Sequence, residues 1–379
     1  MTNKPTIAIV AAGQMGSGVA KRLTSPPHSL TILTNLEGRS AASHRRAKEA
    51  GMEDISLSEI IQKADWVLSI LPPSEAFGFA RKFRDAVDSE TLSSTDARFV
   101  DCNAVNPETV KRIRDVLVED SGGSRRKVRF IDAGIIGGPP NLKTGYDPVF
   151  YASVDEGDED LLAAFEGLKE FGLNVKGLRG EGAGVGDASA LKMSYAGMTK
   201  GIIGICTTMI LAANSSSPAT ATALLHELHD SQPSLLQRII TSTPSMLPKA
   251  YRWVGEMEEI SSFVNTSLTP PSQPIDPNSF SSYENDEGKI HEGLARLYDR
   301  VDNSLNGQGD DSVAVLKKFV QDAEKMVVEI FMDPSVFNRK TRITLNMSRC
   351  PSDLYLWPMK DVWSNIIFAN SGGRVKSTS

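Results

Sequence analysis

The hydrophobic and polar positions follow different patterns in the two halves of the chain. In the first half, short apolar runs rich in β-branched residues alternate with amphipathic stretches such as 57–63 and 108–118. The runs lie at residues 7–10, 30–33, 66–71, 98–101 and 128–131. Apolar strands that alternate with helices are typical of a parallel sheet covered on both faces. The first half is therefore predicted to be a doubly wound α/β domain.

The first apolar run breaks into a glycine-containing turn. Residues 7–18 read IAIVAAGQMGSG, a pattern Ala-x-Gly-x-x-Gly with Ala11 where such turns usually have their first glycine. Small residues let a pyrophosphate approach the amide groups at the start of the next helix. The turn thus predicts a Rossmann-type dinucleotide site in which Ala11 supplies the tight-turn geometry despite its Cβ. The predicted cofactor contacts here are Ala12, Gly13, Gln14, Met15 and Gly16.

The residues after the second apolar run bear on cofactor preference. At this point a dinucleotide fold places a carboxylate that accepts from the ribose 2′-OH, or a cation that binds a 2′-phosphate. Asn35, Arg39 and Ser40 offer donors for a phosphate, and two arginines follow closely. We therefore favour NADPH (NADP). NAD stays open because of Glu37, and the arginines could instead solvate a helix face.

Three loops follow the strands that end near residues 71, 101 and 131. Because ligands bind outside the carboxyl ends of parallel strands, these loops are expected to converge. Leu71, Pro72 and Asn103 are predicted to contact the cofactor. The third loop is expected to span residues 132–140, including a pair of glycines at 137 and 138.

The second half of the chain shows helical spacing and few strand signals. Helices are predicted at 219–229, 233–241, 251–264 and 289–303, with an exposed, proline-rich loop at about 266–288. The predicted division is a dinucleotide-binding domain at 1–178, a long connecting helix at 179–213, a helical C-terminal domain at 214–350, and an extension with a disordered end at 351–379.

One lysine stands out within the connecting helix. Lys192 follows a glycine-rich stretch at 180–186 and lies in a helix that is apolar nearly all round. Burial of an ammonium group is costly and lowers its pKa, which suits a general acid/base. The alternative is a lysine that snorkels to water. Tyr195 and Thr199, at i+3 and i+7, lie near the same face and could hydrogen-bond a reacting oxygen.

Together these motifs resemble the β-hydroxyacid dehydrogenase superfamily, which includes 6-phosphogluconate dehydrogenase and imine reductases. The resemblance spans roughly residues 6–205, and 231–257 resembles a branch with its own helical C-terminal domain. It implies that Lys192 relays a proton during hydride transfer. It also implies that Gly137, Gly138 and Ile136 bind substrate and that the chain forms a homodimer through the connecting helix and C-terminal domain.

Two positions depart from that family's pattern. The asparagines that usually follow the lysine are Tyr195 and Ala196, and the serine that usually precedes the glycine pair is Ile136. A small hydroxy acid held by its carboxylate is therefore doubtful. Isoleucines and prolines around the glycine pair favour a bulkier or less charged carbonyl compound.

Composition and charge exclude several other classes. With 41 basic and 47 acidic residues, the net charge of −6 offers no broad cationic field for a nucleic acid. Three widely spaced cysteines are interpreted as free thiols in a reducing compartment. No metal-ligand spacing is found, no apolar run is expected to span a membrane, and a cytoplasmic location is predicted. A cation–aromatic cluster at 249–253 either packs the core or binds an anionic or aromatic substrate.

The sequence thus predicts an NADPH-dependent oxidoreductase that transfers hydride between nicotinamide and a carbonyl or alcohol substrate, with Lys192 as the proton donor. An imine reductase or reductive aminase would use the same cofactor site. A protein of another class, a catalytically inactive NADPH-binding sensor or scaffold, would bind the cofactor without turnover.

Overall fold

The computed structural model describes residues 4–89, 97–118, 128–268 and 287–332. By compactness the chain divides into two units, Met1–Val320 and Gln321–Ser379, and the description below concerns the first. The predicted extension at 351–379 and most of the predicted 266–288 loop lie outside the described residues. The domain boundaries proposed from the sequence stay a prediction.

The N-terminal part is built on one eight-stranded sheet with the order β3-β2-β1-β4-β5-β6-β7-β8. Strands β1 to β6 run parallel, β7 is antiparallel to β6, and β8 is parallel to β7. The order of the first six strands is that of a dinucleotide-binding sheet. The predicted doubly wound sheet is confirmed. Its strands are Ile7–Val10, Ile32–Thr34, Met52–Asp54, Trp66–Ser69, Ala97–Asp101, Val128–Ile136, Val149–Ser153 and Val175–Gly177.

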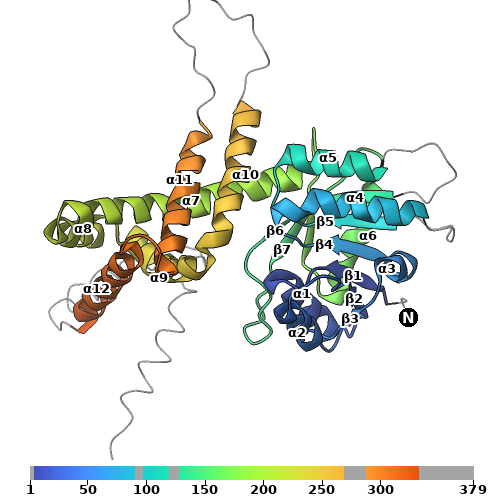
Figure 1. Cartoon of the computed structure of the whole chain (residues 1–379), viewed down its shortest axis with the longest axis horizontal. Coiled ribbons are helices and arrows are strands. Elements are labelled where there is room, and N and C mark those ends of the chain that lie inside the picture. The colour runs from blue at the N-terminus through green and yellow to red at the C-terminus, as the bar shows by residue number, and fades with distance from the viewer. Residues whose placement is uncertain (1–3, 90–96, 119–127, 269–286, 333–379) are drawn as a thin grey trace, which may run out of the picture. The chain divides into compact units, whose positions relative to one another are not determined.

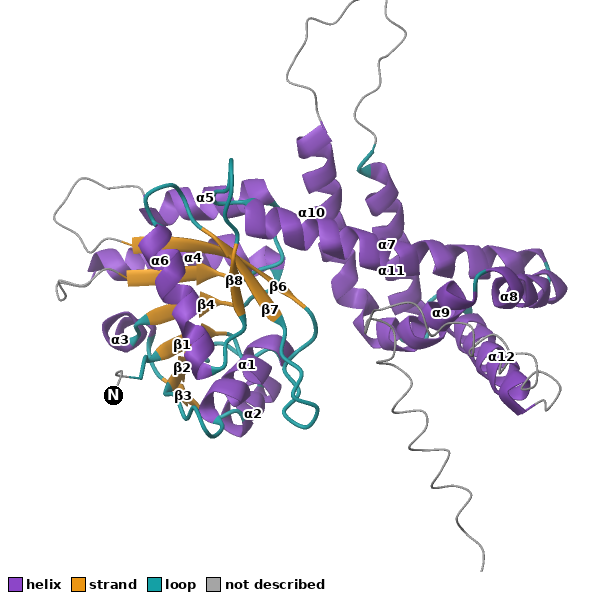
Figure 2. Cartoon of the chain, turned by 180° about the vertical axis from the view of Figure 1, so that it is seen from behind, coloured by secondary structure: helices purple, strands orange, loops and turns teal. Residues whose placement is uncertain are grey.

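Helices cover both faces of this sheet (Figure 2). The helices are α1 Gln14–Thr24, α2 Ala41–Glu49, α3 Leu57–Lys63, α4 Pro73–Ser89, α5 Pro107–Val118 and α6 Glu159–Glu166. Alternate residues of β1 join different cores: Ile7 and Ile9 pack with α1, α2 and α6, whereas Ala8 and Val10 pack with α3, α4 and α5. This two-sided burial explains why the strands read as continuous apolar runs.

Several elements of this domain differ from the prediction. The fifth predicted strand, β6, continues from residue 131 to Ile136, so the expected loop at 132–140 begins only at Gly137. The extension forms because the antiparallel strand β7 pairs with residues 132–136. Strands β3, β7 and β8 and helix α4 have no counterpart in the sequence prediction. Strands β3 and β8 have only three residues each, and α4 begins with a proline.

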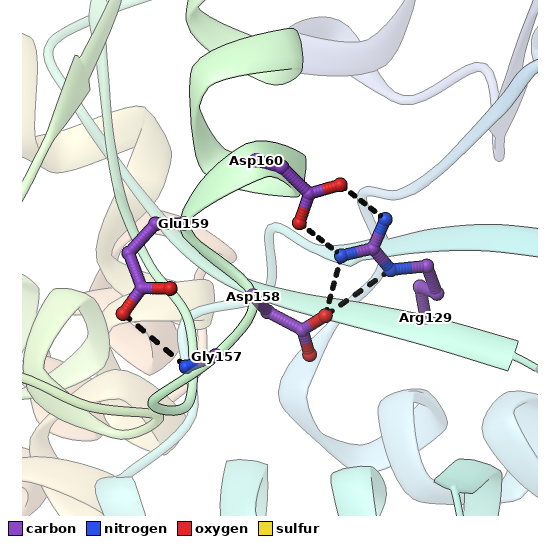
Figure 3. Close-up of polar contacts among 5 residues, drawn as sticks. All are labelled: Arg129, Gly157, Asp158, Glu159 and Asp160. Atoms are coloured by element: carbon purple, nitrogen blue, oxygen red, sulfur yellow. Dashed lines mark hydrogen bonds and ion pairs between the residues drawn. The ribbon is translucent and has the colours of Figure 1, made fainter.

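An arginine clamp fixes α6 to the sheet (Figure 3). The Arg129 guanidinium, near the amino end of β6, donates to Asp158 at 3.1 Å and to Asp160 at 2.8 Å. Its hydrogen bond holds the pKa of Asp160 at about 2. The clamp lies at the opposite end of β6 from the carboxyl edge, and we therefore assign it a structural role.

The remaining described elements of the first unit are helices, as predicted. They are α7 Asp187–Ser216, α8 Pro218–Ser231, α9 Pro233–Met246, α10 Ala250–Leu268, α11 Lys289–Leu305 and the start of α12, which spans Ser312–Met332. Helices α10 and α11 lie side by side and both pack on α7 (Figure 1). Tyr298 of α11 is fully buried, makes an edge-on contact with Trp253 of α10, and donates a 2.6 Å hydrogen bond to the Lys200 carbonyl of α7. Aromatic packing thus joins these three helices.

Among the described residues, α7 is the one helix long and apolar enough to cross a membrane, judged by length and composition, with 33% of its most apolar window buried. The expectation that no apolar run reaches this length is therefore wrong for α7. A core helix of a soluble protein passes the same test, so a single such helix is weak support for a membrane span.

Candidate active site at the carboxyl edge of the sheet

The glycine turn has the geometry of a pyrophosphate cradle. Ala11 has φ +74°, so a residue with a Cβ does make the tight turn, as predicted. Gly13 is the N-cap of α1, and the position that a Cβ would take on it is open space. A Cβ on Gly16 would come within 2.3 Å of the Ala11 carbonyl oxygen, so only glycine fits there. Because none of the described side chains caps the first amide groups of α1, these amides can bind an anionic ligand, and this turn fits a dinucleotide.

The donors predicted for a 2′-phosphate differ in their availability. The Asn35 side-chain amide donates to the Ile55 carbonyl at 3.0 Å, and the Ser40 hydroxyl caps α2 by accepting from Ser43 N. The Arg39 guanidinium is partly exposed and pairs with Glu75 at 2.7 Å. Arg46 donates through Nε to the Ala12 carbonyl at 2.7 Å, which ties α2 to the glycine turn. Of the three predicted donors, Arg39 is therefore the one that can leave the Glu75 carboxylate and turn toward the phosphate of a ligand.

The loops after β4 and β5 are joined by one asparagine. Asn103 is buried, and its Oδ1 accepts from Leu71 N at 2.6 Å while its Nδ2 donates to Ser69 Oγ and to Asp101 Oδ2. The expected convergence of these loops is thus present. The amide of Asn103 is fully used by the protein, so the structure gives it a positioning role beside the predicted cofactor contacts Leu71 and Pro72.

Asp132, which the sequence analysis did not select, anchors the start of α7. This fully buried carboxylate accepts from Gly186 N at 2.9 Å, from Ser189 N at 3.1 Å, and from Ser189 Oγ at 2.7 Å. Burial raises its pKa. Its neighbour across the parallel ladder is Asp101, whose pKa burial and the charge of Asp132 raise to about 7. Asp132 thus fixes the end of the helix that carries Lys192.

Lys192 lies against the last residues of strand β6. A Cβ on Gly134 would come within 2.5 Å of the Ala188 carbonyl oxygen and 3.0 Å of the Lys192 Cβ, so this glycine lets α7 approach the strand. The Lys192 ammonium donates to the Ile135 carbonyl oxygen. Burial and the nearby cation Lys200 lower the pKa of Lys192 to about 8. A lysine with that pKa can lose and regain a proton near neutral pH.

A partly buried ion pair lies further along the same helix. The Lys200 ammonium contacts Glu256 Oε2 of α10 and lies 5.3 Å from the centre of the Trp253 ring. This pairing gives Lys200 a structural role. The Glu256 carboxylate also raises the pKa of Lys192, whereas Arg252 lowers it. The charge of α10 therefore tunes the candidate proton donor.

The two hydroxyls predicted to assist Lys192 are placed differently from each other. Thr199 donates its hydroxyl hydrogen to the Tyr195 carbonyl at 2.8 Å, within α7 itself. The Tyr195 side chain is 47% exposed. Helical spacing alone put both near Lys192, but backbone bonding occupies the Thr199 hydroxyl. The Tyr195 hydroxyl makes no hydrogen bond to the described residues, and its role as an oxygen partner remains a prediction.

The glycine pair after β6 is covered by a tyrosine that the sequence analysis missed. Gly137 has φ +122°, and Gly138 N donates to the Tyr146 hydroxyl oxygen at 3.2 Å. The amide of Gly138 is thus already paired within the protein. Ile136, predicted beside the substrate, ends β6 and is half-buried.

Comparison with known proteins agrees with this architecture. Residues 6–97 match the family model described as NADP oxidoreductase coenzyme F420-dependent, and residues 216–301 match a domain of unknown function, DUF1932. A search of curated proteins returned no match.

Several solved structures have a similar fold, and the similarity extends over almost the whole length of each of them. One is a conserved protein described as structurally similar to 3-hydroxyacid dehydrogenases, with 24% identity, a TM-score of 0.52, and 80% of this chain and 99% of that one covered. A conserved protein of Sinorhizobium meliloti has 19% identity and a TM-score of 0.53, covering 84% and 97%. The 3-hydroxyisobutyrate dehydrogenase of Mycobacterium tuberculosis has 16% identity and a TM-score of 0.51, covering 83% and 99%.

The chain has the fold of the 3-hydroxyacid dehydrogenases, as the motifs indicated. The glycine turn lies within residues 6–97, the part of the chain that matches the family model described as NADP oxidoreductase coenzyme F420-dependent.

Proposed function

We propose that this protein is an NADPH-dependent oxidoreductase that interconverts a carbonyl compound and its alcohol, with Lys192 as general acid/base. The observation that carries the proposal is the position of Lys192. Its ammonium group, with a pKa of about 8, lies at the end of β6, on the sheet edge where β1 ends in the glycine turn. A proton carrier and a dinucleotide cradle on one edge are what hydride transfer with proton exchange requires.

Each part of the edge has a task in this reaction. The free amide groups at the start of α1 bind the pyrophosphate, and Asn103 holds the Leu71 loop beside it. When bound, the nicotinamide supplies or accepts the hydride. The Ile135 carbonyl orients the Lys192 ammonium. The ammonium gives a proton to the carbonyl oxygen of the substrate as that oxygen gains negative charge. In the opposite direction the neutral amine takes the alcohol proton.

The cofactor preference depends on Arg39 in this proposal. We expect Arg39→Ala to weaken NADPH binding by roughly tenfold, because a charge-assisted contact to the 2′-phosphate is lost, and to leave NADH binding nearly unchanged. Titration of both cofactors into the protein, followed by nicotinamide fluorescence, measures this. Glu75→Gln is the matched control: it frees Arg39 from its 2.7 Å partner and should tighten NADPH binding slightly. Equal loss for both cofactors would contradict the assignment.

We also propose a homodimer, assembled through α7. Five exposed apolar side chains recur at heptad spacing along one face of this helix. They are Tyr195, Met198, Ile202, Ile205 and Met209. Such a stripe is the pattern of a helix that packs on a partner. In the proposed dimer, Tyr195 lies at the margin between this interface and the active site.

The dimer is tested by placing a charge in the stripe. Ile205, 54% exposed, should give a monomer as Ile205→Glu, because a carboxylate buried in an apolar interface lacks a partner. Light scattering after size exclusion measures the mass. Ala223→Glu, an equal change on an exposed position of α8, should keep the wild-type mass. A monomeric wild-type protein would contradict the proposal.

We further propose a cytoplasmic location, consistent with the free thiols Cys102 and Cys206.

A further inference from the structure

The loop between β6 and β7 carries a tyrosine onto the glycine pair. A Cβ on Gly137 would come within 2.2 Å of the Tyr146 hydroxyl oxygen, so the hydroxyl fills the space that glycine leaves. That oxygen accepts from Gly138 N at 3.2 Å. A phenol also has a hydrogen to donate, and no acceptor for it is found among the described residues. The hydroxyl is therefore held in place while its hydrogen remains available to donate to a ligand.

The same loop is fastened to the helix that begins at the glycine turn. A Cβ on Gly18 of α1 would come within 3.1 Å of Pro139 and 3.2 Å of Pro140, which shows how closely the loop lies on α1. Arg22 of α1 pairs with Asp147 at 3.1 Å. These contacts, on both sides of Tyr146 in the sequence, hold its position relative to the dinucleotide cradle.

The backbone partners of Tyr146 and of the candidate proton donor are close to each other along the chain. Lys192 donates to the Ile135 carbonyl, and Gly138, which donates to Tyr146, follows only three residues later. Three residues span at most about 11 Å even when fully extended. The Lys192 ammonium and the Tyr146 hydroxyl thus each bond to an atom of the same short segment at the carboxyl end of β6, where the substrate of the proposed reaction would bind.

We propose that Tyr146 is a substrate-contacting, specificity-determining residue that donates a hydrogen bond to a second acceptor of the substrate. The substrate class is then a carbonyl compound that carries an ester, amide, hydroxyl or carboxylate oxygen a few atoms from the reacting carbonyl. This inference rests on the proposed oxidoreductase function. Ile136, which has no polar side-chain atom, leaves this hydrogen-bonding task to the loop.

The alternative is that Tyr146 only closes the loop, in which case its hydroxyl serves Gly138 and no ligand. The two cases differ in what Tyr146→Phe does to matched ligands. We use methyl acetoacetate, a ketone with an ester acceptor, and 2-hexanone, a ketone of similar size without one. Binding to the protein–NADP⁺ complex is followed by ligand-observed NMR, and NADPH-dependent reduction of each compound is measured separately.

We expect Tyr146→Phe to weaken binding of methyl acetoacetate, and to lower its kcat/KM, by roughly five- to tenfold, the effect of one hydrogen bond. Binding of 2-hexanone and of NADPH should not change. Thr144→Val is the matched control, since it removes a hydroxyl from the same loop at an exposed position. It should behave as wild type with both ketones.

The outcomes separate this inference from the proposed function. Tyr146-dependent binding of the ketoester without any turnover supports the inference and contradicts the oxidoreductase proposal. Turnover of both ketones with equal values for wild type and Tyr146→Phe overturns the inference and keeps the oxidoreductase. A wild-type complex that binds neither ketone, or an equal loss for both ketones in the variant, also overturns the inference.

Discussion

Lys192→Met is expected to lose turnover by about 10²–10⁴-fold while it keeps wild-type NADPH affinity. Methionine fills a similar volume and needs no partner for a charge, so the contact of α7 with β6 at Gly134 should be kept. The variant removes the ammonium that stabilises the developing oxyanion. Steady-state rates of ketone reduction and NADPH fluorescence titration measure the two effects independently.

The control for this change is Lys169→Met, at an exposed lysine near the surface of the α/β domain, which should leave both quantities unchanged. A Lys192→Met enzyme that reduces ketones at the wild-type rate would refute the assigned role. If the wild-type protein reduces cyclic imines but no ketone, and Lys192→Met keeps that activity, the result would support the imine reductase alternative. Tight NADPH binding without turnover of either class would favour the sensor.

The pH dependence follows from the same group. Because the pKa of Lys192 is lowered to about 8, the ammonium form that donates in the reducing direction is lost as pH rises through that value. We expect kcat/KM for reduction to fall above about pH 8 and kcat/KM for alcohol oxidation to rise over the same range. Glu256 raises the pKa of Lys192, so Glu256→Gln should move both profiles to lower pH. Profiles that do not move would argue against this coupling.

Local signals were sufficient where backbone geometry or helix capping decides the structure. The glycine turn, including the positive φ of Ala11, follows from small residues between an apolar strand and a helix. The predicted amphipathic stretch 57–63 coincides with α3, which Ser56 and Glu59 begin with a capping box, and prolines stand at the first positions of α8 and α9. These features need only neighbouring residues.

The rest of the site depends on residues far apart in the sequence. Gly134 reads as a loop signal, yet it lies within β6 because α7 must approach the strand there. Two partners of Asp132, Gly186 and Ser189, lie more than 50 residues downstream, and Glu256 lies 56 residues from Lys200. Tyr146 gave no signal because its contact with Gly138 needs the folded loop. Single-sequence patterns cannot register such pairs.

Asp132→Ala should cost roughly 3 kcal/mol of unfolding free energy, because it leaves buried donors without an acceptor. The donors are the amides of Gly186 and Ser189 and the hydroxyls of Ser189 and Ser153. Urea unfolding followed by circular dichroism measures the change. Asp158→Asn at the surface clamp is the control, with an expected loss below about 1 kcal/mol.

A milder variant tests the same anchor should Asp132→Ala fail to fold. Ser189→Ala removes one 2.7 Å hydrogen bond to Asp132 and should cost about 1 kcal/mol. Since Ser189 lies one turn before Lys192 on α7, we also expect a lower kcat with little change in NADPH affinity, whereas loss of stability alone would leave the kcat of the folded fraction unchanged. Wild-type stability and kcat in Ser189→Ala would show that Asp132 does not position the lysine helix.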